Sequence, residues 1–435
     1  MGRIETSRPT ILMIGDIGGP DRYHVGDEAI FTACVEWTKT ALPECRLVAV
    51  SEDPQFTSRN LSIESIWQPR LPDNPLFERS YWNARLTAML LGNLSRWLSV
   101  PDERHLGQIY SSLSAARLLY ICGGGNLTSL FSGELRLRSV MALLALDMGI
   151  PVVGSGQTLG PHLTAADSDL MRLWLGRVEF LGVRDEQRSP AIARELGVDG
   201  KKIHVHPDDA YLLEPTEVRT EWLEKLRSRR REEALIGVSF HLSPADGNST
   251  EELSLRLARL LDRVMGETTA TILFIPHETS VGREAYDVAF ARAVEKYLRS
   301  PQRFHVLTDF LSDREVKYLT GCCDLILSTR YHGIVFALSS GVPCVGLMQD
   351  EYTAVKMRGA FHLAGVPESV VDVWDPELDR KVLEFWKHRA TFEASIAHNR
   401  DEIRHRIEAY QRSLSRVIGE LVNGNELLSA QERKE

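Results

Sequence analysis

The chain has 435 residues, more than one hydrophobic core usually serves, so we expect two domains. Hydrophobic residues make up 43% and charged residues 26% of the sequence, as in an ordinary folded protein without low-complexity segments. The formal net charge of -9 argues against a protein that coats nucleic acid or anionic lipid, and we expect no nucleic-acid partner.

The sequence predicts a cytoplasmic protein with reduced thiols. Its six cysteines stand at positions 34, 45, 122, 322, 323 and 344, without a CxxC pair and mostly inside apolar segments. The adjacent Cys322 and Cys323 lack Cys or His neighbours that would complete a metal site, so we interpret them as packing residues. The first apolar run begins too close to Met1 for a signal peptide, and no run is long enough to span a membrane.

Apolar segments of strand length alternate with helix-length segments in the first half of the chain. They are residues 10–15, 46–51, 117–125, 151–157, 179–185 and 202–212. Continuous apolar strands separated by helices are typical of a parallel sheet that is covered on both faces. We therefore predict a doubly wound, Rossmann-like α/β domain over residues 1–215.

A highly charged stretch, residues 216–233, follows this domain and is predicted to be a linker or a solvated helix. The strand pattern then restarts. Its apolar segments are residues 235–241, 269–278, 304–309, 324–329 and 343–347. They predict a second, smaller Rossmann-like domain over residues 234–370.

The last part of the chain, residues 371–435, is predicted to be helical. Apolar side chains recur there three, four and seven positions apart, at Ile396, Ile403, Ile407, Tyr410, Leu414, Val417 and Leu421. This spacing predicts a long amphipathic helix that packs across both domains as a brace. A coiled coil with a partner is the alternative, but the segment holds few heptads.

Polar motifs follow the predicted strands where those strands end. In chain order they are GDIGGPDRYHVGDEAI, GGGNLTS, GQTLGP, VRDEQRS and STRYHG. In open parallel sheets, ligands bind beyond the carboxyl ends of the strands, where loops and helix N-termini converge. We therefore expect these five motifs to form one site.

Arg184 and Arg330 each stand at a junction between a buried strand and a helix. An unpaired charge is costly to bury there, and a guanidinium at such a junction can fork onto phosphate or carboxylate. Asp185 offers Arg184 a structural partner, whereas the sequence around Arg330 contains no acid. His332 opens the next helix, so an anion would meet Arg330, an imidazole and a helix N-terminus together. The pattern predicts an anion site.

Cofactor motifs are weak in this sequence. It has no GxxxxGK[ST], and GSGQTLG lacks the third glycine of a dinucleotide fingerprint, so nicotinamide and P-loop nucleotide functions are poorly supported. His204, His206, Asp208 and Asp209 alternate along one strand and offer a metal ligand set. We favour a loop-orienting role for the two aspartates, and expect no metal.

With these motifs in order, residues 10–365 resemble the polysaccharide pyruvyl transferase family. The resemblance is carried by GDEAI, GGGNL, GQTLGP, VRDEQRS, DDAYLL, IGVSFH, IPHE and STRYHGIVFALSSGVPCVGL, with Lys356 downstream. It implies a GT-B-like fold, in which two Rossmann-like domains with parallel sheets face each other across a cleft. It also implies transfer of pyruvate from phosphoenolpyruvate onto sugar hydroxyls as a ketal, with phosphoenolpyruvate as the donor substrate and no cofactor.

The resemblance also implies roles for particular residues. Arg184 and Arg330 match the family's arginines, and His332 matches its histidine, which we expect to act as the acid/base because imidazole titrates near the working pH. Asp27 or Glu28 is predicted to accept the proton of the acceptor hydroxyl. Further substrate contacts are predicted from Gly124, Gly125, Asn126, Gln157 and Lys356. The N-terminal domain is the expected acceptor side and the C-terminal domain the donor side.

The motifs do not name the acceptor. A sugar, a nucleotide sugar or a lipid-linked glycan precursor would each fit. The family usually has Asn two residues before the Gly-Asp pair, where this chain has His24, so the acceptor side is expected to differ. The apolar segment 80–100 is interpreted as a core helix or lid, with peripheral contact to the inner face of a membrane as the alternative. A homo-oligomer is also compatible with the sequence.

Two other functions are compatible with the sequence. One is a nucleotide-sugar glycosyltransferase of the same architecture. The acid-x7-acid pattern of its retaining members fails here, because Gly359 stands eight residues after Glu351. The other is a family member that binds a glycan or an anion without catalysis.

Overall fold

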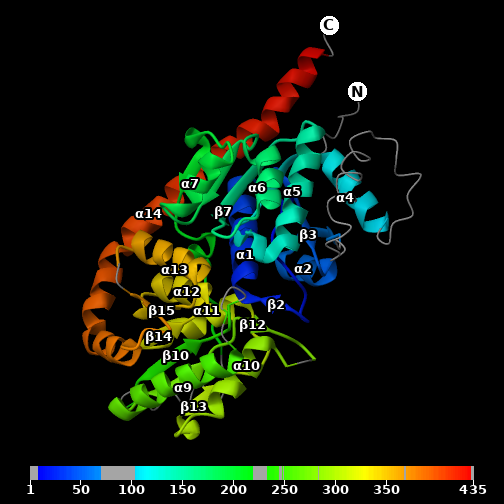
Figure 1. Ribbon diagram of the computed structural model, residues 1–435. Helices are drawn as coiled ribbons and strands as arrows, with labels where there is room; N and C mark the ends of the chain where they lie inside the picture. Colours follow the sequence, from blue (N-terminus) through cyan, green and yellow to red (C-terminus); the bar gives the residue numbers. More distant parts are fainter. Residues whose placement is uncertain are drawn as a thin grey trace.

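The computed structural model describes residues 8–69, 103–218, 233–243, 247, 249–282, 284–366 and 369–432, with side chains except in 103–107 and 424–432. Residues 80–100 and most of the predicted linker 216–233 lie outside these ranges. The architecture is the predicted one: two α/β domains with parallel sheets and a long C-terminal helix (Figure 1). The proposed domain boundaries themselves stay predictions.

The N-terminal sheet is parallel throughout. Its order is β4 (Glu64–Trp67), β3 (Arg46–Ser51), β1 (Thr10–Ile14), β5 (Ala116–Ile121), β7 (Val152–Leu159), β8 (Phe180–Val183) and β9 (Ile203–Val205), and β6 (Gly124–Leu127) also pairs with β7. Side chains alternate between its two faces, as the strand period of two requires. In β1, Ile11 and Met13 join one apolar cluster, and Leu12 and Ile14 join another.

The C-terminal sheet is smaller and also parallel. Its order is β13 (Phe304–Val306), β11 (Thr271–Phe274), β10 (Leu235–Ser239), β14 (Leu325–Ser328), β15 (Cys344–Met348) and β16 (Val370–Asp372). Two short antiparallel strands, β2 (Tyr23–His24) and β12 (Glu278–Thr279), pair with each other and link the domains. The sequence did not predict these two strands, because each has only two residues.

Helices cover both sheets, and many begin at a side-chain cap. Those of the N-terminal domain are α1 (Val25–Ala41), α2 (Pro54–Leu61), α4 (Glu103–Ala115), α5 (Ser132–Asp147), α6 (Ala165–Leu175) and α7 (Arg188–Glu195). Those of the C-terminal domain are α9 (Thr250–Glu267), α10 (Tyr286–Glu295), α11 (Asp313–Gly321), α12 (Tyr331–Ser340) and α13 (Glu351–Leu363). Short 3-10 turns are η1 (Ser129–Phe131), η2 (Gly200–Lys202), η3 (Asp209–Leu212) and η4 (Pro301–Arg303). Asp350, for example, accepts a hydrogen bond from Thr353 N (2.7 Å) and so fixes the start of α13.

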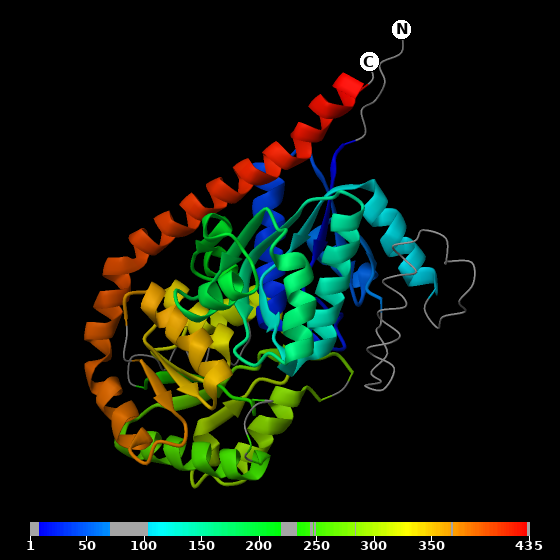
Figure 2. The ribbon, with the colours of Figure 1, turned by 45° about the horizontal axis from the view of Figure 1, so that its top comes forward.

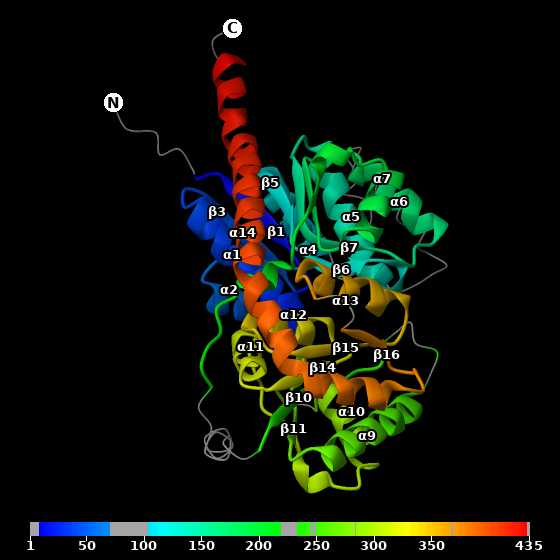
Figure 3. The ribbon, with the colours of Figure 1, turned by 90° about the vertical axis from the view of Figure 1, so that its left-hand side faces the viewer.

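The terminal helix α14 (Leu378–Glu432) runs from the C-terminal domain along the N-terminal domain (orange to red in Figures 2 and 3). Leu378 and Val382 pack in the C-terminal core, and Ile396, Ile403 and Ile407 pack in the core that both domains share. The predicted brace is therefore confirmed. None of the helices in the described ranges combines the length and the apolar character needed to cross a membrane.

Candidate active site

A cavity of about 310 Å³ lies between the domains and is bordered by the loops that follow β1, β6, β8 and β14. Its walls are formed by Asp16, Arg22, His24, Gly26, Asp27, Gly125, Asn126, Phe131, Glu134 and Arg184 of the N-terminal domain, and by His241, Leu242, His277, Glu278, Tyr286, Thr329, Arg330, Tyr331, His332, Tyr352, Thr353, Lys356 and Met357 of the C-terminal domain. Titratable groups dominate this lining. Of the predicted site residues, Asp27, Gly125, Asn126, Arg184, Arg330, His332 and Lys356 meet here.

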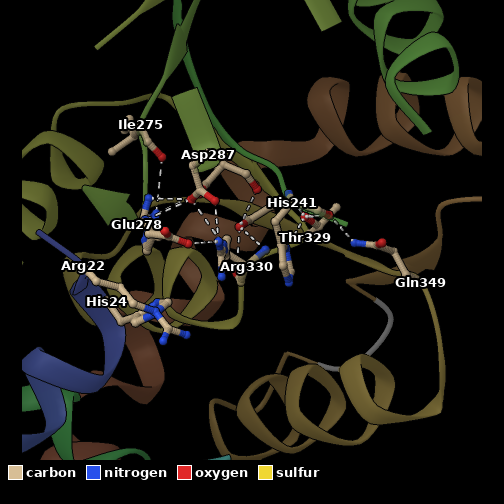
Figure 4. Close-up of polar contacts among 12 residues, drawn as sticks. Arg22, His24, His241, Ile275, Glu278, Asp287, Thr329, Arg330 and Gln349 are labelled. Carbon is tan, nitrogen blue, oxygen red and sulfur yellow. Dashed lines mark hydrogen bonds and ion pairs between the residues drawn. The ribbon is translucent and has the colours of Figure 1, made fainter. Parts of the chain in front are cut away.

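Arg330 caps the start of α12, where Ser328 Oγ accepts a hydrogen bond from Arg330 N (3.0 Å). Its guanidinium forms a two-pronged ion pair with Asp287, through Nε (3.2 Å) and Nη2, and Glu278 lies 3.9 Å away (Figure 4). The local sequence offers Arg330 no obvious acid, and its acidic partner comes from elsewhere in the chain. Asp287 stands 43 positions earlier in the chain, in the first turn of α10, so no local sequence pattern connects the two.

Arg184 is almost fully buried and paired with Asp208, Nη1 to Oδ2, at 2.6 Å. Its Nε donates to Thr158 Oγ1 (2.8 Å), and the guanidinium lies 4.5 Å from the centre of the Tyr331 ring. Its partner is Asp208, whereas the neighbouring Asp185 caps α7 by accepting hydrogen bonds from the backbone of Arg188 (2.7 Å). The remaining amino group, Nη2, is directed towards Gly125 in the cavity wall.

His332 stands in the first turn of α12 and is wedged between the domains. Its Nε2 lies 3.6 Å from Asp208 Oδ2, and a Cβ added to Gly26 at the start of α1 would stand 1.8 Å from its Nδ1. Burial lowers the pKa of His332, and Asp208 opposes this shift. The imidazole is therefore neutral near pH 7 until negative charge arrives beside it.

The wall of the C-terminal domain holds a second buried imidazole, that of His277. Its Nδ1 lies 2.8 Å from Ser239 Oγ, and burial lowers its pKa to about 3. The Nε2 atoms of His277 and His332 are buried and have no hydrogen-bond partner among the described residues. Such atoms are uncommon in folded proteins and indicate a ligand or an ordered water at the site.

Lys356 reaches the cavity from α13. Its ammonium lies 3.6 Å from the centre of the Tyr352 ring, and no carboxylate of the described residues lies within ion-pair distance of it. Burial and then the charge of Arg184 lower its pKa to about 7. Tyr352 itself crosses the cleft and donates a hydrogen bond to Gly125 O (3.0 Å). A Cβ on Gly125 would stand 2.4 Å from the Tyr352 hydroxyl, so this contact requires glycine.

Asp27 and Asp16 face the cavity from the N-terminal domain. Burial, and then the charge of Asp16, raise the pKa of Asp27 to about 7. Asp16 accepts a hydrogen bond from Asn126 Nδ2 (2.8 Å). We did not predict Asp16 as a site residue, although it follows β1 at the carboxyl end of a parallel strand, the same signal that identified Arg184.

Three predicted site residues lie behind the wall of the cavity. Glu28 accepts a hydrogen bond from Gly18 N (2.9 Å) and holds the loop after β1. Gln157 donates through Nε2 to the carbonyl oxygens of Cys122 (2.8 Å) and Ser155 (2.8 Å). Gly124 is buried in β6. The hydrogen bonds of Glu28 and Gln157 hold the neighbouring backbone, and the catalytic or substrate-binding roles expected for these three residues stay predictions.

The residues considered as metal ligands diverge. His204 stacks on Phe180, with ring centres 3.9 Å apart, and His206 stacks on Tyr410 of α14, with ring centres 3.4 Å apart. Asp208 pairs with Arg184, and Asp209 accepts a hydrogen bond from Ser155 Oγ (2.9 Å). Across the described part of the chain, no three His, Cys, Asp or Glu side chains gather in a way that could hold a metal ion.

A larger cavity of about 700 Å³ lies on the other face of α13, beside α7. It is lined by Asp185, Glu186, Gln187, Arg188, Ala191, Val355, Arg358, Gly359, Phe361, His362 and Val370. Its charged groups are paired at the surface, as in His362 with Glu186 (2.6 Å) and Arg188 with Glu351 (3.2 Å). Of these two cavities, the smaller is the one in which several buried titratable groups converge, which makes it the candidate active site.

Solved structures with the same fold include nucleotide-sugar enzymes. Anabaena HepE in complex with UDP and glucose is 14% identical, with a TM-score of 0.56 over 94% of this chain and 99% of that one. A putative UDP-N-acetylglucosamine 2-epimerase from Listeria monocytogenes is 11% identical, with a TM-score of 0.59 over 90% of this chain and 91% of that one. UDP-GlcNAc 2-epimerase from Neisseria meningitidis bound to UDP-GlcNAc is 13% identical, with a TM-score of 0.55 over 89% of this chain and 93% of that one. At these identities the likeness shows the GT-B fold alone.

The sequence itself matches a family model over most of its length. The model for polysaccharide pyruvyl transferase covers residues 24–351, which contain α1 and the whole β14–α12 junction. This range includes Arg184, Arg330 and His332 of the cavity. The chain belongs to the polysaccharide pyruvyl transferase family.

Proposed function

We propose that this protein transfers the pyruvyl group of phosphoenolpyruvate to two hydroxyls of a sugar or glycan precursor, forming a ketal and releasing phosphate. Family membership supports pyruvyl transfer in polysaccharide synthesis. The cavity supports phosphoenolpyruvate as the donor. This molecule carries a phosphate and a carboxylate and needs several cationic groups, and Arg184, Arg330 and Lys356 line the cavity. The reaction as written balances without a redox cofactor.

The proposed chemistry has three steps. The enol carbon of the donor takes up a proton and becomes a methyl group, and a first sugar hydroxyl adds to the neighbouring carbon and loses its proton. A second hydroxyl then adds to the same carbon, and the bond between that carbon and the phosphate oxygen breaks. The two hydroxyls together release two protons. One balances the proton that the carbon took up and the other ends on the phosphate, so atoms and charge balance.

The observation that carries the proposal is the positive charge of Lys356. Arg184 and Arg330 are already paired with Asp208 and Asp287, and contribute their remaining N–H groups. Lys356 is different, since its ammonium rests on an aromatic ring with no carboxylate of the described residues within ion-pair distance. An anion entering the cavity therefore gains most from Lys356.

His332 and Asp27 suit the proton transfers. A bound phosphate favours the charged form of His332, which then has a proton for the enol carbon. Asp27 has a pKa raised to about 7, which suits a general base at neutral pH. The two residues approach from opposite domains, His332 from α12 and Asp27 from α1.

The direct test is phosphoenolpyruvate binding by calorimetry, followed by phosphate release with sugars, nucleotide sugars and lipid-linked glycans as acceptors. Lys356→Met, which keeps the apolar stem, is expected to weaken binding about tenfold or more, because it removes a charge-assisted contact. Lys387→Met on the exposed face of α14 is the matched control. A wild-type protein that fails to bind phosphoenolpyruvate would contradict the proposal.

The second candidate is a nucleotide-sugar transferase, because the HepE and Neisseria structures contain UDP or UDP-GlcNAc. The same calorimetry with UDP separates the two functions. Tight UDP binding without phosphoenolpyruvate binding would favour the nucleotide-sugar function. Binding of anions without turnover of any acceptor would favour a non-catalytic family member.

A further inference from the structure

One wall of the cavity is made by the N-terminal domain alone and differs in charge from the rest. It consists of Asp16 after β1, Asp27 in the first turn of α1, Asn126 in β6, Phe131 in η1 and Glu134 in the first turn of α5. We call these five residues the acidic wall. Hydroxyl groups can be held here by three carboxylates and an amide, and an apolar ring lies beside them.

The carboxylates of the acidic wall form no ion pair among the described residues, although the charges of Arg184, Arg138 and Lys356 act on Asp27, and those of Arg138 and Arg22 on Glu134. Among the ion pairs of the described residues, none involves Asp16, Asp27 or Glu134, and the hydrogen bond from Asn126 to Asp16 is neutral on the donor side. Burial and the charge of Asp16 raise the pKa values of both Asp27 and Glu134, as expected for carboxylates that repel one another.

None of the cavity's cations forms an ion pair with the acidic wall. Arg184 pairs with Asp208 and Arg330 with Asp287, and the ammonium of Lys356 lies over the Tyr352 ring. Arg22 belongs to the loop nearest the acidic wall, but it is exposed and donates through Nε to His24 Nε2 (3.1 Å). Arg138 is buried behind Glu134, where its Nη1 donates to the Glu134 carbonyl (3.2 Å).

Phe131 gives the acidic wall an apolar face. Its ring meets the ring of Tyr352 edge to face, with centres 5.8 Å apart, and both residues line the cavity. An aromatic ring beside a few convergent polar groups is a common way to hold a small ligand that has polar edges and an apolar face, which is the shape of a sugar ring.

We propose that the acidic wall binds the ring of the acceptor sugar and selects a ring without an anionic substituent, so that neutral and amino sugars are accepted and uronic acids are rejected. This inference rests on the proposed transfer to sugar hydroxyls and names the class of acceptor. A ring carboxylate would stand beside Asp16, Asp27 and Glu134, none of which forms an ion pair with a cation of the described residues, so like charges would repel it. A phosphate on the acceptor would have to extend towards Arg22.

The test uses methyl hexopyranosides in the gluco, manno and galacto configurations, each with its matching hexuronide and 2-amino-2-deoxy hexoside. Binding is measured by saturation-transfer NMR with phosphoenolpyruvate present, and turnover by phosphate release. We expect the hexuronides to bind about tenfold more weakly than their neutral partners. Glu134→Gln and Asp16→Asn are expected to reduce this difference, and Glu420→Gln on the exposed face of α14 is the control that should leave it unchanged.

The results separate this inference from the proposed function. Hexuronides that bind as well as neutral sugars would overturn it, as would unchanged discrimination in both variants. A protein that binds phosphoenolpyruvate but none of the sugars would also overturn it. If neutral sugars bind better than hexuronides but phosphoenolpyruvate does not bind, the results would support the acidic wall and contradict the proposed donor.

Discussion

At the scale of single residues, two glycines of the N-terminal domain receive side chains from the C-terminal domain. His332 fills the space of a Cβ on Gly26, and Tyr352 fills that of a Cβ on Gly125. Both contacts lie in the cavity wall. These glycines therefore leave the space in which the imidazole of His332 and the Tyr352 ring under Lys356 lie.

Gly26→Ala is predicted to impair turnover more than folding. The added methyl group would lie 1.8 Å from His332 Nδ1, so the imidazole must move, and a displacement of about 1 Å can cost about a hundredfold in rate. The measurement is kcat for phosphate release, with the phosphoenolpyruvate affinity as a second readout. Gly266→Ala in α9, where a Cβ meets nothing within 4 Å, is the control. A Gly26→Ala enzyme with the wild-type kcat would show that His332 does not act from this position.

Lys356 predicts a pH dependence of donor binding. Its pKa is lowered from 10.5 to about 7, chiefly by burial and then by Arg184, and a bound anion would raise it again. Its contribution to affinity is therefore complete below pH 7 and falls as the pH rises, by up to about tenfold per pH unit. Calorimetry with phosphoenolpyruvate from pH 6.5 to 8.5 measures this slope. Lys356→Arg keeps its charge, so an equally steep slope in that variant would assign the effect to another group.

The sequence predicted the charged residues of this cavity better than it predicted the carboxylates that pair with them. Arg184, Arg330 and His332 were found because a charge at the end of a buried strand is unusual. Their partners Asp208 and Asp287 lie 24 and 43 positions away in the chain, and only the packing of separate elements brings them together. Asp16 was within reach of the same strand-end rule, and Glu134 was not, since it stands in a helix whose face towards the cavity depends on the fold.

At the scale of elements, most strands were predictable because they lie in apolar segments bounded by turns. Strands β2, β4, β12 and β16, of two to four residues each, were not predicted. The long helix α14 was predicted with its apolar face correct up to Leu414. Beyond it the structure buries Ile418 and Val422, whereas Val417 and Leu421 are only partly buried. Apolar residues follow Leu414 in the sequence at spacings of both three and four positions, and either set could form the buried face. Contact with the domain surface decides between them.

The different burial of Ile418 and Val417 predicts a testable difference in stability between their alanine variants. Ile418→Ala is predicted to lower the free energy of unfolding by about 2 to 5 kcal/mol, because it leaves a cavity in the core shared by α14 and both domains. Val417→Ala, one position earlier, is expected to cost about 1 kcal/mol or less, since its side chain is partly exposed. Chemical denaturation of both variants measures the two costs. Equal costs would mean that the face of α14 continues through Val417.

At the scale of the whole molecule, the two domains are joined by one continuous apolar core. It includes Ile11 of the N-terminal sheet, Phe31 of α1, Phe336 of α12 and Ile403 of α14. Polar contacts add to this junction. Lys317 Nζ donates to Tyr211 O (2.7 Å), and Val25 N donates to His277 O (2.9 Å). The cavity of about 310 Å³ is thus closed in by contacts from both domains.

We predict that the domains move apart when the proposed glycan acceptor binds, because the cavity lies between them. The β2–β12 junction is the place to test this, since Val281 N donates to Pro20 O (2.8 Å) and Ser280 Oγ donates to Asp21 O (3.1 Å), and neither Asp21 nor Val281 lines the cavity. Asp21→Cys with Val281→Cys places two thiols at this exposed junction, whereas all six native cysteines are buried.

Oxidation of this double variant is expected to abolish turnover of a glycan acceptor, and reduction with dithiothreitol to restore it. The reduced form of the same protein is the control, so any effect of the substitutions themselves cancels. Mass spectrometry establishes that the disulfide has formed, and phosphate release measures turnover. Phosphoenolpyruvate is small compared with a glycan, so its binding separates opening from site damage. An oxidised protein that turns over as fast as its reduced form would show that the acceptor enters without separation of β2 from β12.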